Sequence, residues 1–169
     1  MALDGFAWWN LAMGRFLDRA AELQNRFLDR LRHPAAFEVA GRPGISADFS
    51  SLRGCRQCLL VTFKRSGDAV PSPVNFGLSD DGSLYLRCDP DAAKLKRLKR
   101  DPHVRVCACS YRGKPLGPLV EGTARLLDAA EAERAHDIVA ASWDLFNRLY
   151  EGAVDRMNVP IAYVEVRPA

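Results

Sequence analysis

Six stretches of β-forming residues, separated by turns, constrain the fold of this chain more than any other feature. They are residues 57–65, 69–79, 83–88, 103–111, 119–128 and 161–168. The turn sequences at 66–68 and 80–82 are typical of β-hairpins. Only two helical segments, 89–100 and 129–155, interrupt the strands. The sequence therefore predicts a mainly β (α+β) domain built as a six-stranded antiparallel barrel with short helices, and not a parallel α/β fold.

The first 33 residues predict an amphipathic helix outside the barrel. Apolar residues recur there at three- and four-residue spacing, at Phe16, Ala20, Leu23, Phe27 and Leu31. One interpretation is a helix that packs on the same chain or on a second subunit, and the other is a helix that lies on a membrane surface. Prolines and glycines then indicate a linker over 34–50, which leaves 51–169 as the barrel domain.

Composition argues for a globular chain without a broad anion-binding surface. The net charge of +3 is too small for a protein whose whole surface binds nucleic acid, so no nucleic-acid partner is expected. No basic residue of a secretory signal precedes Arg15, and the longest apolar stretch, 5–14, is far shorter than the roughly 20 residues that cross a bilayer. We expect a cytoplasmic protein, which associates with membranes only if residues 1–33 do.

The five cysteines, an odd number, are expected to be reduced thiols. The pair Cys55 and Cys58, together with Cys107 and Cys109, has a spacing compatible with a four-ligand zinc or iron–sulfur site. The first pair has no glycine between its members to form a metal knuckle, and it leads directly into a strand. Buried thiols without a metal are therefore the prediction.

A basic helix follows the third strand. Asp89 suits its N-cap and Pro90 its first turn, and the Asp-Pro pair at 101–102 ends it. At about 100° per residue, Leu95 and Leu98 form the apolar stripe of this helix. The stripe predicts which side of the helix packs on the barrel.

The cations of the basic helix divide into two groups. Those interpreted as a solvated face are Lys96, Lys99 and Arg100. Lys94 and Arg97 instead lie one turn apart near the start of the helix, beside Arg87 of the preceding strand. Helix-start amides, an ammonium and a guanidinium together form a natural phosphate pocket. Phosphate binding is thus one prediction for this pair, and a solvated surface is the other.

Four motifs follow one another in a fixed order along the barrel domain. They occupy residues 62–76, 84–89, 94–106 and 109–127. In this order they resemble the split β-barrel superfamily of pyridoxamine 5'-phosphate oxidase-like flavin proteins. The resemblance covers roughly residues 55–167 and is closest to the branch that uses an 8-hydroxy-5-deazaflavin coenzyme, F-420, instead of FMN.

The resemblance implies a homodimer with two cofactor sites at the subunit interface, each lined by both chains. It places the first hairpin beside the isoalloxazine-type ring, the end of the third strand near the ribityl phosphate, and the start of the basic helix on the phosphate itself. The residues so implied are Thr62, Phe63, Ser72, Pro73, Val74, Asn75, Arg87, Cys88, Lys94 and Arg97. Cys88 departs from the family pattern, where a threonine or similar hydroxyl residue is expected, and a thiol is a poor donor.

The function implied by the resemblance is a reductase that transfers a hydride between the deazaflavin coenzyme and a small organic substrate. Tyr111 is a candidate proton donor or substrate contact, as are Lys114 and His103, although each also fits an ordinary packing or surface role. Two alternatives remain. One is an FMN-dependent flavin reductase or oxidase of the same fold, and the other is a non-catalytic cofactor- or haem-handling split barrel.

Overall fold

The computed structural model describes residues 32–142 and 160–169 of the chain. The chain divides into two compact units, residues 1–32 and 33–169, and every element described below belongs to the second. The helix predicted over 1–33 lies outside the described residues except for its end, and so do both interpretations of it, packing on a protein surface and contact with a membrane. Residues 143–155 of the second predicted helix lie outside them as well.

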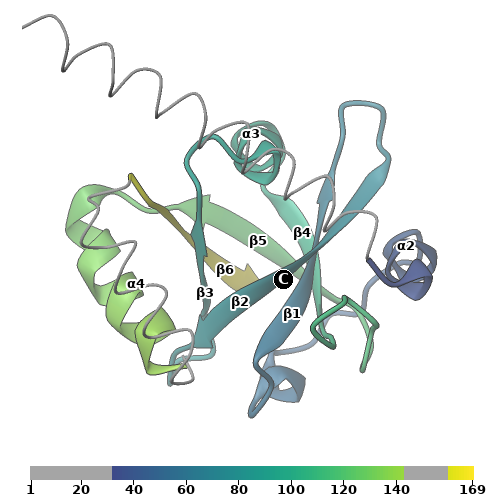
Figure 1. The fold of residues 1–169 in the computed structure, drawn as a ribbon, viewed down its shortest axis with the longest axis horizontal. Helices are drawn as coiled ribbons and strands as arrows, with labels where there is room; N and C mark the ends of the chain where they lie inside the picture. Colours follow the sequence, from purple (N-terminus) through teal and green to yellow (C-terminus); the bar gives the residue numbers. More distant parts are fainter. Residues whose placement is uncertain (1–31, 143–159) are drawn as a thin grey trace, which may run out of the picture. The chain divides into compact units, whose positions relative to one another are not determined.

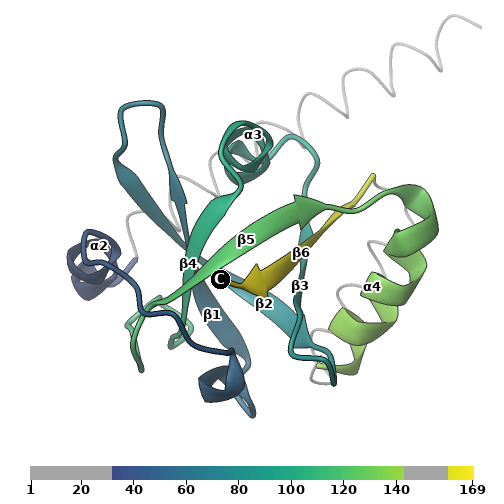
Figure 2. The same ribbon diagram turned by 180° about the vertical axis from the view of Figure 1, so that it is seen from behind.

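Six antiparallel strands form a closed barrel in the order β1-β2-β3-β6-β5-β4 (Figures 1 and 2). The strands are β1 (Gln57–Phe63), β2 (Ala69–Leu78), β3 (Leu84–Cys88), β4 (His103–Ala108), β5 (Val120–Leu126) and β6 (Ala162–Pro168). The predicted six-stranded antiparallel barrel is therefore confirmed, with strands that are mostly slightly shorter than predicted. Because β6 joins β3 to β5, each strand has a neighbour on both sides and the sheet has no open edge.

Strand residues alternate between the barrel interior and an outer buried layer. On β1, Cys58 and Leu60 belong to the interior core, whereas Leu59 and Val61 belong to a separate cluster on the outer face. Leu60 lies directly opposite Ser72 of β2. Opposite residues of antiparallel strands share a face, so the even-numbered positions of both strands point inward along this pairing.

Helix α2 (Pro34–Ala40) occupies part of the segment for which the sequence predicted a linker. Its N-cap is His33, whose Nδ1 accepts a hydrogen bond from a backbone N–H of the first turn at 3.2 Å. Ala36 and Ala40 are fully buried in the outer layer with residues of β1 and β4. The linker prediction is thus corrected for residues 34–40, because Pro34 and the glycine after Ala40 mark the ends of a packed helix.

Helix α3 (Ala93–Arg100) starts later than the sequence predicted. Its N-cap is Ala92 and not Asp89. The Asp89 carboxylate instead accepts a hydrogen bond from the backbone N–H of Asp91 at 2.8 Å, in a turn that precedes the helix. The helix ends at its C-cap Asp101, as predicted.

Helix α4 (Ala129–Ala141) begins with a capping box formed by Asp128 and Glu131 and packs on the outer side of β2, β3 and β6. Gly77 of β2 allows the close approach, because a Cβ at this position would lie 2.4 Å from the carbonyl oxygen of Ile138. The described part of the chain contains no helix that is both long and apolar enough to cross a membrane.

Candidate functional site

Helix α3 covers one end of the barrel, next to the hairpin that joins β1 to β2 (Figures 1 and 2). Leu95 and Leu98, the predicted apolar stripe, are 1% and 3% exposed and join the interior core. The stripe therefore closes this end of the barrel, and its position sets the direction of every other side chain on the helix.

The cations of α3 separate as the sequence predicted. The exposed ones are Lys96, Lys99 and Arg100. Lys94 and Arg97 are half-buried. This difference in burial matters, because water weakens the field of an exposed charge far more than that of a charge at the edge of a protein interior.

Two arginines of α3 attach the helix to the end of β1. Arg97 Nε donates a hydrogen bond to Thr62 Oγ1 at 2.7 Å, and the Arg100 guanidinium donates to the carbonyl oxygen of Phe63. Thr62 is fully buried. The bond between the two side chains therefore holds the Arg97 guanidinium against the wall of the barrel.

The Lys94 side chain makes no hydrogen bond or ion pair within the described residues. Its charge nevertheless affects two thiols of the barrel interior. Burial raises the pKa of the Cys88 thiol, and the Lys94 ammonium opposes that rise. Burial and the neighbouring thiols raise the pKa of Cys58 well above its ordinary value, and Lys94 opposes this rise too. A half-buried ammonium without an ion pair is a favourable position for an anionic ligand.

The predicted cofactor residues of the first hairpin lie on two faces of it. On the interior side are Thr62, Ser72 and Val74. On the outer side are Phe63, Pro73 and Asn75. Asn75 Oδ1 accepts a hydrogen bond from Gln57 Nε2 at 3.1 Å. A ligand on the outer surface of the barrel can therefore meet only the second group directly.

The other predicted residues point in different directions. Cys88 is part of the interior core, whereas Arg87 lies opposite Tyr163 of β6, on the side that α4 covers. Tyr111 is 81% exposed in the loop between β4 and β5. The structure thus brings Arg97 into contact with Thr62, one turn from Lys94, and directs Arg87 to another face.

A second group of charged side chains, which the sequence reasoning missed, surrounds Glu121 on β5. Its carboxylate accepts hydrogen bonds from the backbone N–H of Gly44 at 2.7 Å and from Arg105 Nε at 2.9 Å, and His103 Nε2 lies 2.6 Å away. Burial alone would raise the pKa of Glu121, but these contacts outweigh it and hold the pKa below its ordinary value. Arg105 also donates to the carbonyl of Arg42 at 2.8 Å, which ties the segment after α2 to the barrel.

The ring of Phe63, one of the predicted cofactor contacts, is part of this second group. The His103 ring stacks on it at a centroid distance of 5.0 Å and an interplanar angle of 12°. The Arg105 guanidinium lies 5.1 Å from its centroid. His103, a candidate proton donor from the sequence, is thus held by both a ring and a carboxylate. No local pattern reveals this group, since its members come from distant segments.

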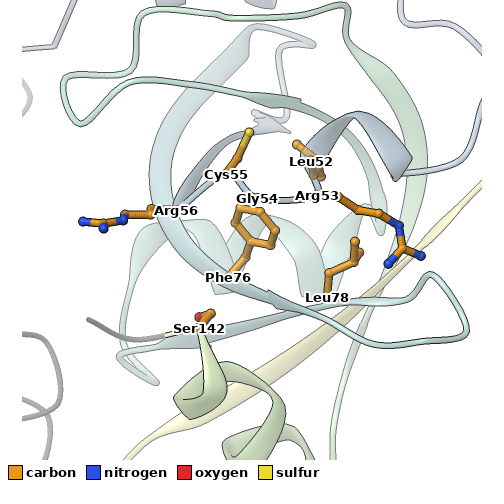
Figure 3. Close-up of a pocket in the computed structure, with 8 residues that line it drawn as sticks. All are labelled: Leu52, Arg53, Gly54, Cys55, Arg56, Phe76, Leu78 and Ser142. Carbon is orange, nitrogen blue, oxygen red and sulfur yellow. The ribbon is translucent and has the colours of Figure 1, made fainter. Parts of the chain in front are cut away.

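A pocket of about 370 Å³ lies at the opposite end of β1 from α3. It is lined by Leu52, Arg53, Gly54, Cys55, Arg56, Phe76, Leu78 and Ser142. In Figure 3 the Phe76 ring faces the pocket, whereas the guanidinium groups of Arg53 and Arg56 point away from it on opposite sides. Its charged groups do not converge on one point, so this pocket is a weaker candidate than the α3 site.

The cysteines lie on both sides of the barrel wall, close enough for their charges to interact. Cys58 faces the interior, whereas Cys107 and Cys109 lie in the outer layer under α2. Burial raises the pKa of Cys107 to about 11, and burial with two neighbouring thiols raises that of Cys109 to about 12. Among residues 32–142 and 160–169, no three His, Cys, Asp or Glu side chains are arranged to hold a metal ion. These thiols are therefore packing residues with little thiolate character.

Comparison with known proteins places the chain in a family. The family model described as pyridoxamine 5'-phosphate oxidase matches residues 48–169, which is most of the sequence. No curated protein matches the chain. Since the match spans the whole barrel, the chain belongs to the pyridoxamine 5'-phosphate oxidase family.

Solved structures share the fold at low sequence identity. A putative 5-nitroimidazole antibiotic resistance protein from Bacteroides thetaiotaomicron is 18% identical, with 70% of this chain and 76% of that chain covered and a TM-score of 0.52. The haem storage protein HutZ from Vibrio cholerae is 12% identical, with 69% and 84% covered and a TM-score of 0.51. A conserved hypothetical protein, Rv2991, from Mycobacterium tuberculosis is 19% identical, with 73% and 82% covered and a TM-score of 0.50.

Proposed function

We propose, on the premise that this chain is a member of the pyridoxamine 5'-phosphate oxidase family, that it is an oxidoreductase which holds the phosphate of an isoalloxazine-type cofactor on α3. The finer hypothesis is a reductase that transfers a hydride between the deazaflavin coenzyme F-420 and a small organic substrate. One observation carries the proposal. Lys94 is a half-buried cation at the end of the barrel that makes no ion pair among the described residues.

The start of α3 offers further groups that fit a phosphate. Its N-cap residue, Ala92, has no side chain that could cap the first turn, and the Leu95 N–H already donates to the Ala92 carbonyl oxygen, so the earlier amides, of Ala93 and Lys94, are those that suit an anion. Arg97 lies one turn beyond Lys94, with its Nε already bound to Thr62. An ammonium, a guanidinium and a helix N-terminus on one side of one short helix is the combination that phosphate groups favour.

In this proposal the residues of the chain bind the cofactor and orient it. When bound, the ring of such a cofactor accepts or donates a hydride. Lys94 and Arg97 balance the phosphate charge, while Cys88, which is 5% exposed, offers at most a weak donor where the family pattern has a hydroxyl. The cationic pair therefore supplies most of the affinity for the phosphate end of the ligand.

We extend the proposal to a homodimer in which both chains line each site, as the family resemblance implies. Phe63, Pro73 and Asn75 on the outer side of the hairpin then face the ring or the second chain. Tyr111, exposed at 81%, is accessible to a substrate at such an interface. Light scattering of the purified chain gives the mass in solution, and a monomer in the presence of cofactor would contradict this part.

FMN is the alternative cofactor, because its terminal monophosphate fits the same two cations. The deazaflavin coenzyme continues through a phosphodiester into a longer anionic tail, which the exposed cations Lys64, Arg65 and Lys96 suit. A haem-handling role is the non-catalytic alternative. Each of the three histidines makes a hydrogen bond through one ring nitrogen, to the first turn of α2, to Glu121 or to the Tyr163 hydroxyl. A hydrogen bond at one ring nitrogen is compatible with iron ligation by the other, so the preference for a phosphate-bearing cofactor rests on the α3 cations and not on the histidines.

A parallel titration tests the proposal. The full chain, Lys94→Ala and the matched control Lys99→Ala are titrated with FMN and with F-420, and binding is followed by fluorescence. We expect one cofactor to bind, Lys94→Ala to weaken it by at least about tenfold, and Lys99→Ala by less than about twofold. Binding of FMN alone replaces the F-420 hypothesis and keeps the site. Binding of neither, or an equal loss in both variants, contradicts the proposal.

A further inference from the structure

Thr62 holds a position that a direct ligand contact does not explain. The resemblance places it beside the cofactor ring, but its side chain is fully buried. It follows Cys58 and Leu60 on the interior side of β1, where a hydroxyl is unfavourable unless it is hydrogen-bonded. Its Oγ1 accepts the Nε–H of Arg97 at 2.7 Å and lies 3.5 Å from the carbonyl oxygen of Val70. The hydroxyl therefore donates to Val70 and accepts from Arg97, and the shorter of the two hydrogen bonds is the one from Arg97.

The bond from Arg97 fixes more than one atom. A guanidinium is flat, and its N–H groups form a rigid fork, so a hydrogen bond at Nε sets the plane in which the Nη donors lie. Hydrogen bonds that involve a charged donor are also stronger than neutral ones, and Arg97 is half-buried, where water competes less. The hydrogen bond to Thr62 thereby contributes to setting the plane in which this guanidinium would meet an anion.

Lys94 needs no such support. Its ammonium is a compact charge at the end of a flexible stem, and it adapts to whichever oxygen lies near it. The pair on α3 thus consists of one adaptable cation and one fixed cation. Only the fixed cation can discriminate by geometry between a phosphate at the right place and an anion elsewhere.

We propose that Thr62 is a positioning residue of the α3 anion site, which acts through Arg97 and gives the site its preference for a ring that carries a phosphate over the same ring without one. The inference rests on the proposed function. The resemblance implied a direct contact between Thr62 and the cofactor. In this inference Thr62 instead supports Arg97 from inside the barrel.

The affinity ratio for riboflavin and FMN measures this preference, because the two ligands differ only by the phosphate. We expect Thr62→Val, which keeps the shape and loses the hydroxyl, to lower the preference for FMN by about fivefold. Thr62→Ser, which keeps the hydroxyl, should retain the preference within about twofold. In an Arg97→Ala background, Thr62→Val should add no further loss, because the two residues act as one unit.

A merely structural role predicts a different result. If Thr62→Val lowers the melting temperature but leaves the ratio of the two affinities unchanged, the inference is wrong. The same conclusion follows if the effects of Thr62→Val and Arg97→Ala add in full. Should Thr62→Val fail to fold, Thr62→Cys takes its place, since a thiol has similar volume and is a poor hydrogen-bond partner.

A separate measurement distinguishes this inference from the proposed function. If neither riboflavin nor FMN binds the wild-type chain, the FMN form of the proposed function fails. Inorganic phosphate is then titrated while the NMR signal of the Arg97 Nε–H is followed. A phosphate-dependent shift in wild type that is reduced in Thr62→Val supports the positioning role. No shift in wild type, or an equal shift in both, overturns it.

Discussion

Glu121 and Lys94 are both partly buried charges, but they differ in the partners that the fold provides for them. Glu121 is surrounded by Gly44, His103 and Arg105, which all lie within hydrogen-bond distance of its carboxylate. The Lys94 side chain makes no hydrogen bond or ion pair anywhere in the part of the chain that the structure describes. A buried charge that the chain itself satisfies contributes to the fold, whereas one left without a partner points to a ligand.

The largest expected effect is a loss of stability when Glu121, whose charge has partners within the chain, is replaced. Glu121→Gln leaves Arg105 and His103 without their carboxylate and loosens the attachment of the segment after α2. We expect the free energy of unfolding to fall by about 2 kcal/mol in urea denaturation. Glu133→Gln, an exposed glutamate on α4, is the matched control and should change it by less than about 0.5 kcal/mol. Equal losses of unfolding free energy in the two variants would contradict a stabilising role for the contacts of Glu121.

A smaller effect follows from pH. The pKa of Glu121 in the folded chain lies below its ordinary value of 4.5, because the hydrogen bonds to its carboxylate outweigh the burial that raises it. A lowered pKa contributes stability that is present above pH 4.5 and is lost as the pH falls through the folded value. The stability difference between wild type and Glu121→Gln should therefore shrink as the pH is lowered below about 4.5. A difference that stays constant down to pH 3 would contradict this.

The smallest expected effect is on the unsatisfied charge. Lys94→Met keeps the length of the side chain and removes a cation that has no ion pair to lose among the described residues. We expect the unfolding free energy of the ligand-free chain to change by less than about 0.5 kcal/mol, or to rise slightly. With the cofactor bound, calorimetry should show that Lys94→Met is less stable than wild type, because the variant binds the ligand more weakly and is stabilised less by it. A large loss in the ligand-free chain would assign Lys94 to the fold.

Local patterns predicted the elements that depend on nearest neighbours in the sequence. The turns at 66–68 and 80–82 and the β-forming runs gave the barrel strands, and the spacing of Leu95 and Leu98 gave the buried side of α3. The same geometry separated Lys94 and Arg97 from the exposed cations of that helix. These predictions succeeded because a helix of 3.6 residues per turn and a strand of period two leave little freedom.

Tertiary contacts were beyond the reach of those patterns. Residues 34–50 looked like a linker because prolines and glycines mark helix ends as well as flexible connections. The Glu121 group joins β4, β5 and the segment after α2, and no spacing in the sequence relates them. The burial of Thr62 likewise depends on its barrel register and on α3, which lies far along the chain. Such sites can be recognised only from the three-dimensional structure.

The closure of the barrel by β6 has a consequence for biosynthesis. β3 and β5 have β6 between them, and β6 is the last of the six strands to leave the ribosome. Until Ala162–Pro168 has emerged, the nascent sheet keeps two bare edges, which are templates for pairing with other chains. The barrel can therefore close only once this short strand is available to pair with both β3 and β5.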